Sequence, residues 1–271
     1  MRRRSFLGLL GAVTGSASLD ALAQPGPKLV AVLMQGGAYR VGFDGLKQAL
    51  EGDISANSIR LALKEGGGDM NTLRGASAEF EKGGADVLVT FATTVSLAAK
   101  EATQQVPIVF IAGSDPVKYG LVESISKPGG RLTGVASFRT EITPKRFALL
   151  KEMIPGLKRV MTFHNPSSPV SVVAGLDHAR KAAAALGIDL VVREVHAPAE
   201  VRAALDGIVA GEADAFFFPN DSMILSESQA IIERATALRI RARPLCPGEN
   251  LSSFGVDVGL REDHIPRHDC L

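Results

Sequence analysis

The sequence contains few cysteines and histidines, which cross-link small proteins or bind metal ions, and few large aromatic residues. It has no tryptophan, two cysteines, two tyrosines and five histidines among 271 residues. Two cysteines cannot make a disulfide-rich scaffold, so a buried apolar core must supply the stability. Cys246 and Cys270 could form one disulfide in an oxidising compartment or stay as free thiols. His164 follows a predicted strand and has no cysteine or carboxylate at the usual ligand spacing, which favours a turn histidine, so we expect no metal site.

Motifs of the common enzyme classes are also missing. The chain contains no G-x-S-x-G nucleophile elbow, no G-x-x-x-x-G-K-[ST] phosphate loop and no H-E-x-x-H helix. Gly66-Gly67-Gly68-Asp69 is rich in glycine but lacks dinucleotide spacing, which favours a flexible turn. We therefore expect no catalytic residues and no cofactor.

Excess charge of either sign is absent as well. The chain carries 30 basic and 29 acidic residues, a formal net charge of +1. Such a balance leaves no electrostatic footprint for nucleic acid or an anionic membrane. Nucleic acid is therefore not an expected partner.

The first 23 residues have the layout of an export signal. Arg2, Arg3 and Arg4 precede a short apolar run, and Ala21-Leu22-Ala23 offers a small-x-small cleavage site. The run Arg3 to Gly8, RRSFLG, is similar to a twin-arginine signal. The alternative is a buried N-terminal helix, but the apolar run is too short to span a bilayer and its basic flank suits export. The predicted product is a soluble periplasmic protein.

Apolar runs and helical patterns alternate along the rest of the chain. Because 46% of the residues are apolar, a large core is expected. The predicted strands of the first half are 28–34, 58–63, 86–92, 107–112 and 131–136. The predicted helices between them are 41–51, 71–83, 94–104 and a short 119–126. Alternation of this kind predicts a parallel sheet covered by helices.

A second series of the same kind follows a polar segment. Its predicted elements are helix 144–153, strand 158–163, helix 170–186, strand 188–195, helix 199–210, strand 213–218 and helix 223–238. The sequence thus predicts an α/β protein with two doubly wound parallel-sheet lobes and a ligand cleft between them. The predicted boundaries are lobe 1 at 24–136, a crossover or hinge at 137–144, lobe 2 at 145–245 and a return segment at 246–271.

Polar side chains stand where several predicted strands end. Ligands of open parallel sheets bind at the carboxyl ends of strands, so these turns are the candidate site. Thr93 and Thr94 open a helix whose free amides would attract a carboxylate, and Asp115 could pair with an ammonium. An ordinary helix cap and an ordinary Asp-Pro turn are the alternatives. The candidates from these turns are Thr93, Thr94, Ser114, Asp115, Asn165, Asn220 and Asp221.

Longer segments resemble the periplasmic substrate-binding proteins of ABC transporters, whose better-known members take up tryptophan and other aromatic amino acids. The similar segments are 85–100, 106–135, 145–171 and 213–224. The second is the most specific, with D-P-V, G-L-V and P-G-G-x-x-T-G in order. The resemblance implies a type I periplasmic-binding fold that closes on its ligand like a hinged clamp.

The resemblance also implies site residues and partners. It adds Gln35 and Gly36, in the turn after the first strand, to the candidates named above. A helix N-terminus suits a carboxylate and the aspartates suit an ammonium, so the expected ligand is an amino acid or similar small zwitterion. A membrane ABC permease is the expected protein partner, and the chain is expected to be a monomer. A periplasmic sensor subunit remains an alternative, which the sequence does not separate from transport. An exported α/β enzyme is a further alternative, against which the missing catalytic motifs argue.

The C-terminal residues depart from the family pattern. After about Ile240, members of the family continue with a strand, a return crossing and a final helix and strand that complete lobe 1. Here Ser253-Phe254-Gly255-Val256-Asp257 keeps a family-like element, but the following residues are short and polar. A truncated or altered return segment is therefore expected. Whether Glu249 takes the place of a glutamate near the lobe junction stays open.

Overall fold

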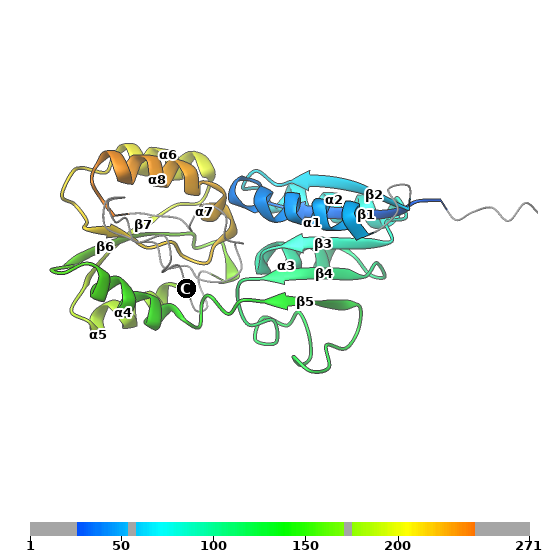
Figure 1. Ribbon diagram of the computed structural model, residues 1–271, viewed down its shortest axis with the longest axis horizontal. Helices are drawn as coiled ribbons and strands as arrows, with labels where there is room; N and C mark the ends of the chain where they lie inside the picture. Colours follow the sequence, from blue (N-terminus) through cyan, green and yellow to red (C-terminus); the bar gives the residue numbers. More distant parts are fainter. Residues whose placement is uncertain (1–25, 54–57, 171–174, 242–271) are drawn as a thin grey trace, which may run out of the picture.

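The structure, a computed structural model, describes residues 26–53, 58–170 and 175–241. The predicted export signal, Glu249, the two cysteines and the return segment 246–271 lie outside these ranges. The described chain forms two α/β lobes, and the segment after β5 (Leu132–Ala136) joins them (Figure 1). The predicted fold class is confirmed.

Lobe 1 contains a five-stranded parallel sheet, called sheet A here, in the order β2-β1-β3-β4-β5. Its other strands are β1 Lys28–Met34, β2 Ile59–Glu65, β3 Val87–Phe91 and β4 Ile108–Ala112. Each lies within two residues of its predicted range. The strand order reverses between β1 and β3, which makes the carboxyl edge there a topological switch point.

Helices cover both faces of sheet A. They are α1 Arg40–Asp53, α2 Met70–Lys82 and α3 Thr93–Ala102, and a 3-10 turn, η1 Gly37–Tyr39, precedes α1. On β1, Ala31 and Leu33 belong to the core shared with α2 and α3, while Val32 and Met34 belong to the core under α1. Burial of both faces explains why β1 is a continuous apolar run rather than an alternating one.

The predicted helix 119–126 is wrong. The chain forms turns there, with Gly120 at φ +69° and Leu121 N donating to Pro116 O at 2.7 Å. Glu123 N donates to Pro128 O at 2.9 Å, which folds the loop back on itself. Glycine in the left-handed region and local turn bonds outweigh the weak helical pattern.

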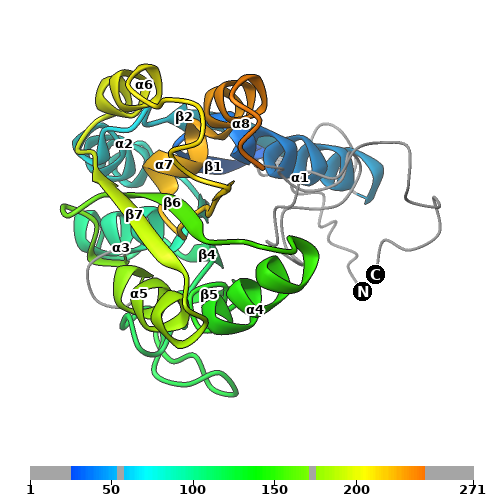
Figure 2. The same cartoon turned by 90° about the vertical axis from the view of Figure 1, so that its left-hand side faces the viewer.

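Lobe 2 contains a three-stranded parallel sheet, called sheet B here, in the order β7-β6-β8. Its strands are β6 Arg159–His164, β7 Asp189–Glu194 and β8 Ala215–Phe216. Its helices are α4 Thr143–Met153, α5 Leu176–Ala185, α6 Pro198–Asp206, α7 Ser222–Ser226 and α8 Ser228–Ala237. The pair α6 and α8 lies on one side of the sheet and the pair α4 and α5 on the other (Figure 2). Sheet B thus repeats the order of the first three strands of sheet A.

Two predictions in lobe 2 need correction. The predicted strand 213–218 pairs regularly only at Ala215–Phe216; Phe217 N still donates to Met161 O, and Pro219 then offers no N–H. The predicted helix 223–238 is two helices, α7 and α8, separated at Glu227. The carboxylate of Glu227 pairs with Arg202 at 3.0 Å, which ties the break to α6.

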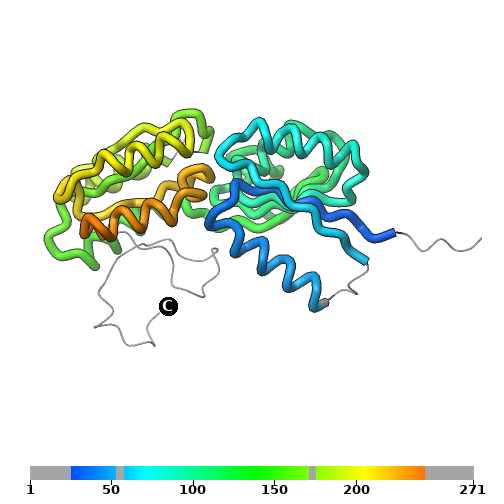
Figure 3. Tube along the Cα trace, turned by 90° about the horizontal axis from the view of Figure 1, so that it is seen from above, coloured from blue at the N-terminus to red at the C-terminus, as the bar shows by residue number. Residues whose placement is uncertain are grey.

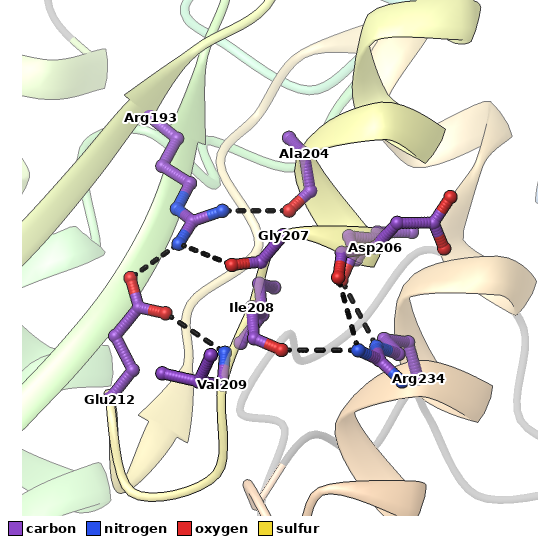
Figure 4. Close-up of polar contacts among 9 residues, drawn as sticks. Arg193, Ala204, Asp206, Gly207, Ile208, Val209, Glu212 and Arg234 are labelled. Carbon is purple, nitrogen blue, oxygen red and sulfur yellow. Dashed lines mark hydrogen bonds and ion pairs between the residues drawn. The ribbon is translucent and has the colours of Figure 1, made fainter.

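Two arginines fasten the end of α6 to its neighbours (Figure 4). Arg193 donates to the carbonyl oxygens of Ala204 and Gly207 and pairs with Glu212 at 2.5 Å. Arg234 of α8 donates to the carbonyl oxygens of residues 205, 206 and 208. The last carbonyls of a helix lack intrahelical partners, and guanidinium groups fill that need here. Within the described ranges no helix is long and apolar enough to cross a membrane.

Candidate functional site

A cavity of about 300 Å³ lies at the carboxyl ends of β3, β4 and β5, where lobe 2 meets sheet A. Apolar atoms dominate its lining. The strands contribute Phe91, Ile111 and Val135, and α7 contributes Leu225. The site therefore occupies the position that the chain topology predicts for a ligand of an open α/β sheet.

Glycine at position 42 lets α1 approach this wall closely. A Cβ atom there would lie 2.6 Å from Cε1 of Phe91. Tyr39, at the end of η1, lines the same side of the cavity. Burial raises the pKa of the Tyr39 hydroxyl above its ordinary value, and the nearby charge of Arg139 opposes that rise. A tyrosine hydroxyl is protonated at neutral pH even at its ordinary pKa, so it can donate a hydrogen bond there.

Arg139 supplies the one positive charge among the described residues that line the cavity. Its backbone N–H donates to Gly113 O at 2.7 Å, and the preceding Phe138 has φ +52°, an uncommon value for a residue with a side chain. The guanidinium Nε is buried and has no hydrogen-bond partner among the described residues. A buried donor without a partner is costly, so a ligand acceptor would be favoured there.

Asn220 connects the two lobes beside the cavity. Its Nδ2 donates to Ser114 Oγ at 2.7 Å and to Thr140 Oγ1 at 3.1 Å. The two hydroxyls lie 2.8 Å apart and complete a triangle of polar groups. Gly113 leaves the room that this contact needs, because a Cβ atom there would clash with the Asn220 amide.

A second contact joins the lobes at the amino end of α3. Thr94 Oγ1 lies 2.8 Å from Ser222 Oγ of α7, and both residues are buried. η1 also contacts α7 and α8, and these segments face each other across the junction in Figure 3. Gly37 lies so close to the carbonyl group of Ser226 that a Cβ atom would clash with it. The structure thus brings the lobes together over the cavity.

Three of the sequence-predicted residues shape the loops around sheet A. Gln35 Oε1 accepts from Gly68 N at 2.8 Å, and Gly36 adopts φ +97° beside the carboxylate of Glu65. Thr93 Oγ1 accepts from the backbone N–H groups of Gly113 and Ser114, both at 3.2 Å. Each side-chain bond connects two turns that follow different strands.

Three other predicted residues hold backbone N–H groups within their own turns. Asp115 Oδ1 accepts from Val117 N and Lys118 N, and Asn165 Oδ1 accepts from Ser167 N. Asp221 Oδ1 accepts from the N–H groups of residues 223 and 224 and caps α7. Burial raises the pKa of the Asp221 carboxyl, and its hydrogen bonds oppose the rise. Among the nine predicted residues, Asn220 lines the cavity itself.

Sequence reasoning did not single out Tyr39, Phe91 or Arg139 as site residues. Arg139 follows β5 by three residues, so the strand-end rule that selected the other turns applies to it too. It was assigned instead to the crossover between the lobes. The apolar side chains carry no comparable signal, since a strand residue that lines a cavity looks like any core residue.

Comparisons with known proteins agree with this architecture. The model of the family described as "ABC transporter substrate binding protein" matches residues 29–250. A tyrosine-binding protein of Clostridioides difficile is 28% identical over 201 residues. That match covers 72% of this chain and 56% of the relative, so the chain spans little more than half of the relative's length.

Two solved structures share the fold. One is the ABC domain in complex with L-Trp from Streptococcus pneumoniae, at a TM-score of 0.67 and 19% identity, covering 82% of this chain and 74% of that one. The other is a conserved domain protein from Vibrio cholerae, at a TM-score of 0.65 and 27% identity, covering 79% and 72%. The two-lobed arrangement of parallel sheets is common to all three chains.

Proposed function

Because the chain belongs to the ABC transporter substrate-binding protein family, we propose that it captures a small molecule between its lobes for an ABC importer. The family consists of solute-binding proteins, which are not enzymes. The observation that carries the proposal is the cavity at the carboxyl ends of β3, β4 and β5, to whose lining Asn220 and Leu225 of lobe 2 also contribute. A ligand held there would touch both lobes and so favour their closure.

The proposed ligand is an amino acid with a large apolar side chain. The related proteins named above include one that binds tyrosine and one solved with L-Trp. Phe91, Ile111 and Leu225 offer an apolar surface for such a side chain, and about 300 Å³ is room for one. Three polar residues of the lining, Arg139, Tyr39 and Asn220, would orient the backbone groups of the ligand.

We propose two structural roles for the nine predicted site residues. Thr94, Ser114 and Asn220 stabilise the closed arrangement by contacts between lobes or at the crossover. The remaining six hold the surrounding turns in place. They are Gln35, Gly36, Thr93, Asp115, Asn165 and Asp221.

The proposed location is the periplasm, and the proposed protein partner is an inner-membrane permease. Arg2 to Arg4 and the Ala21-Leu22-Ala23 site support export through an N-terminal signal, of the twin-arginine type by its RRSFLG run. Replacing Arg3 and Arg4 together by lysine should retain the protein in the cytoplasm. Unchanged export of that variant would favour the general secretory route.

Ligand binding is directly measurable because the chain has no tryptophan. With excitation at the red edge of indole absorption, the signal comes from added L-Trp alone, and a change on adding protein reports binding. L-Tyr, L-Phe and L-Leu are then tested by competition and by thermal shift, since a ligand of the folded form raises the melting temperature. Failure of all four amino acids at millimolar concentration would contradict the proposed ligand class.

A further inference from the structure

We propose that Arg139 is the anchor for a carboxylate group of the ligand, so that the cavity selects apolar organic monocarboxylates. This inference rests on the proposed function, because it concerns the ligand of the same cavity. Arg139 lines the cavity from the crossover, and its charge is near enough to act on the Tyr39 hydroxyl.

The position of Arg139 is fixed by the backbone. Arg139 N donates to Gly113 O, and Ser137 N, two residues earlier, donates to Ala112 O at 2.9 Å. Phe138, between them, is held at φ +52°. An uncommon backbone conformation persists where surrounding contacts enforce it. Both bonds reach the end of β4, so the guanidinium is presented by the sheet edge rather than by a free loop.

The charge of Arg139 lacks a counter-charge in the described part of the protein. No carboxylate there lies within ion-pair distance of its guanidinium, although six other ion pairs are formed. Its Nε is buried without a hydrogen-bond partner. A buried donor without an acceptor is costly, and hydrogen bonds between ionised groups are strong, so an anionic ligand group would satisfy the Nε and balance the charge.

The chemistry of the cavity favours a carboxylate over a phosphate. The planar guanidinium fork fits either anion. Arg139 is the one cationic side chain among the described lining residues, and the rest of the wall is largely apolar. A single positive charge balances a monocarboxylate but leaves a doubly charged phosphate unpaired. Tyr39, which lines the same cavity and is protonated at neutral pH, can donate a further hydrogen bond to the carboxylate.

The described cavity lining has weaker binding partners for a ligand amino group than for a ligand carboxylate. The two aspartates expected to bind an ammonium, Asp115 and Asp221, bond backbone N–H groups and do not line the cavity. Asn220 retains its Oδ1 as a neutral acceptor, since its Nδ2 is used by Ser114 and Thr140. Binding should therefore depend more on the carboxylate than on the amine.

Three indole compounds separate the two groups in the full chain. L-Trp has both groups, indole-3-propionate lacks the amine and tryptamine lacks the carboxylate. Their fluorescence reports binding to a chain without tryptophan. The variants are Arg139→Gln, Arg139→Lys and a control, Arg60→Gln, at an exposed position on β2. Melting temperatures establish that each variant is folded.

We expect Arg139→Gln to lower the affinity for L-Trp and for indole-3-propionate by about ten- to a hundredfold. A hydrogen bond to a charged group usually contributes about that much to affinity. Tryptamine should be little affected, Arg139→Lys should recover part of the loss, and Arg60→Gln should match the wild type. An equal loss for all three compounds would mean a structural role only and would overturn the inference.

The remaining outcomes separate this inference from the proposed function. If L-Trp binds the Arg139→Gln variant as tightly as it binds the wild type, the inference is wrong and the proposed function stands. If indole-3-propionate binds through Arg139 while no amino acid binds, the inference holds and the amino-acid ligand is wrong. If no carboxylate in the panel binds the wild type, both are wrong.

Discussion

Thr94 at the amino end of α3 and Ser222 at the amino end of α7 share a buried hydrogen bond of 2.8 Å across the two lobes. Each residue follows the strand-end turn of its own sheet. The bond therefore joins the two edges between which the cavity lies. Water would compete for both hydroxyls if the lobes separated, so the contact stabilises the arrangement of the lobes seen in the structure.

Removing this bond should weaken ligand binding by destabilising closure. Thr94→Val and Ser222→Ala should each reduce affinity about two- to tenfold, from about 0.5–1.5 kcal/mol for a neutral hydrogen bond. The double variant should lose less than the sum of the two single losses, because both remove the same contact. Fluorescence titration of L-Trp checks this. Strictly additive losses would mean that the two hydroxyls do not cooperate in the bound form.

A methyl group at position 37 should keep the lobes apart. Gly37→Ala places a Cβ against the carbonyl group of Ser226, in a conformation with φ +59°. Gly67→Ala is a matched control, because Gly67 has φ +57° and open space around its Cβ position. Both variants should lose similar stability, about 1 kcal/mol from the left-handed backbone, but Gly37→Ala alone should lose ligand affinity. Equal affinities would show that this contact is dispensable for binding.

Asp221 should act on stability in two separable ways. Its Oδ1 caps α7, so Asp221→Ala should lower the free energy of unfolding by about 0.5–2 kcal/mol, whereas Asp221→Asn keeps an acceptor and should lose less. Urea unfolding at constant pH measures both changes. Similar losses in the two variants would mean that the cap contributes little.

The ionisation of Asp221 should make the wild type less stable as pH rises. Burial raises the pKa of this carboxyl in the folded protein above its unfolded value. The folded state therefore binds more protons than the unfolded state between those two values, and the free energy of unfolding falls as pH increases through that window. Relative to Asp221→Asn, the wild type should lose stability from about pH 4 upward. Parallel pH profiles for the two proteins would contradict this.

Arg234 should matter for stability and not for binding. Arg234→Gln removes the donor of three carbonyl contacts at the end of α6, and we expect a loss of about 1.5–3 kcal/mol (Figure 4). Arg202→Gln is the control, because the arginine side chain is 69% exposed although its partner Glu227 is largely buried, and ion pairs with so exposed a member contribute little to stability. Urea midpoints and L-Trp titration measure both properties. A changed affinity with an unchanged midpoint would reverse the assignment.

Local sequence was enough to predict most elements of the fold. Strands such as Lys28–Met34 are buried on both faces and therefore appear as continuous apolar runs, which periodicity detects. The predicted helix 119–126 failed because local glycine turns outweigh a weak helical pattern, whereas the predicted helix 223–238 is broken where a contact remote in sequence forms. Glu227 separates α7 from α8 while its carboxylate binds Arg202 on α6, and no pattern within 223–238 indicates that partner.

The sequence by itself determined where polar turns occur, because strand ends and helix caps are local features. The tertiary structure alone decided which polar groups face the cavity. Asp115 and Asp221 satisfy nearby backbone N–H groups, whereas Arg139, placed by Gly113 O, lines the cavity without a partner in the described protein. A side chain's freedom to bind a ligand depends on whether the fold has already supplied its partner, and that partner comes from distant parts of the chain.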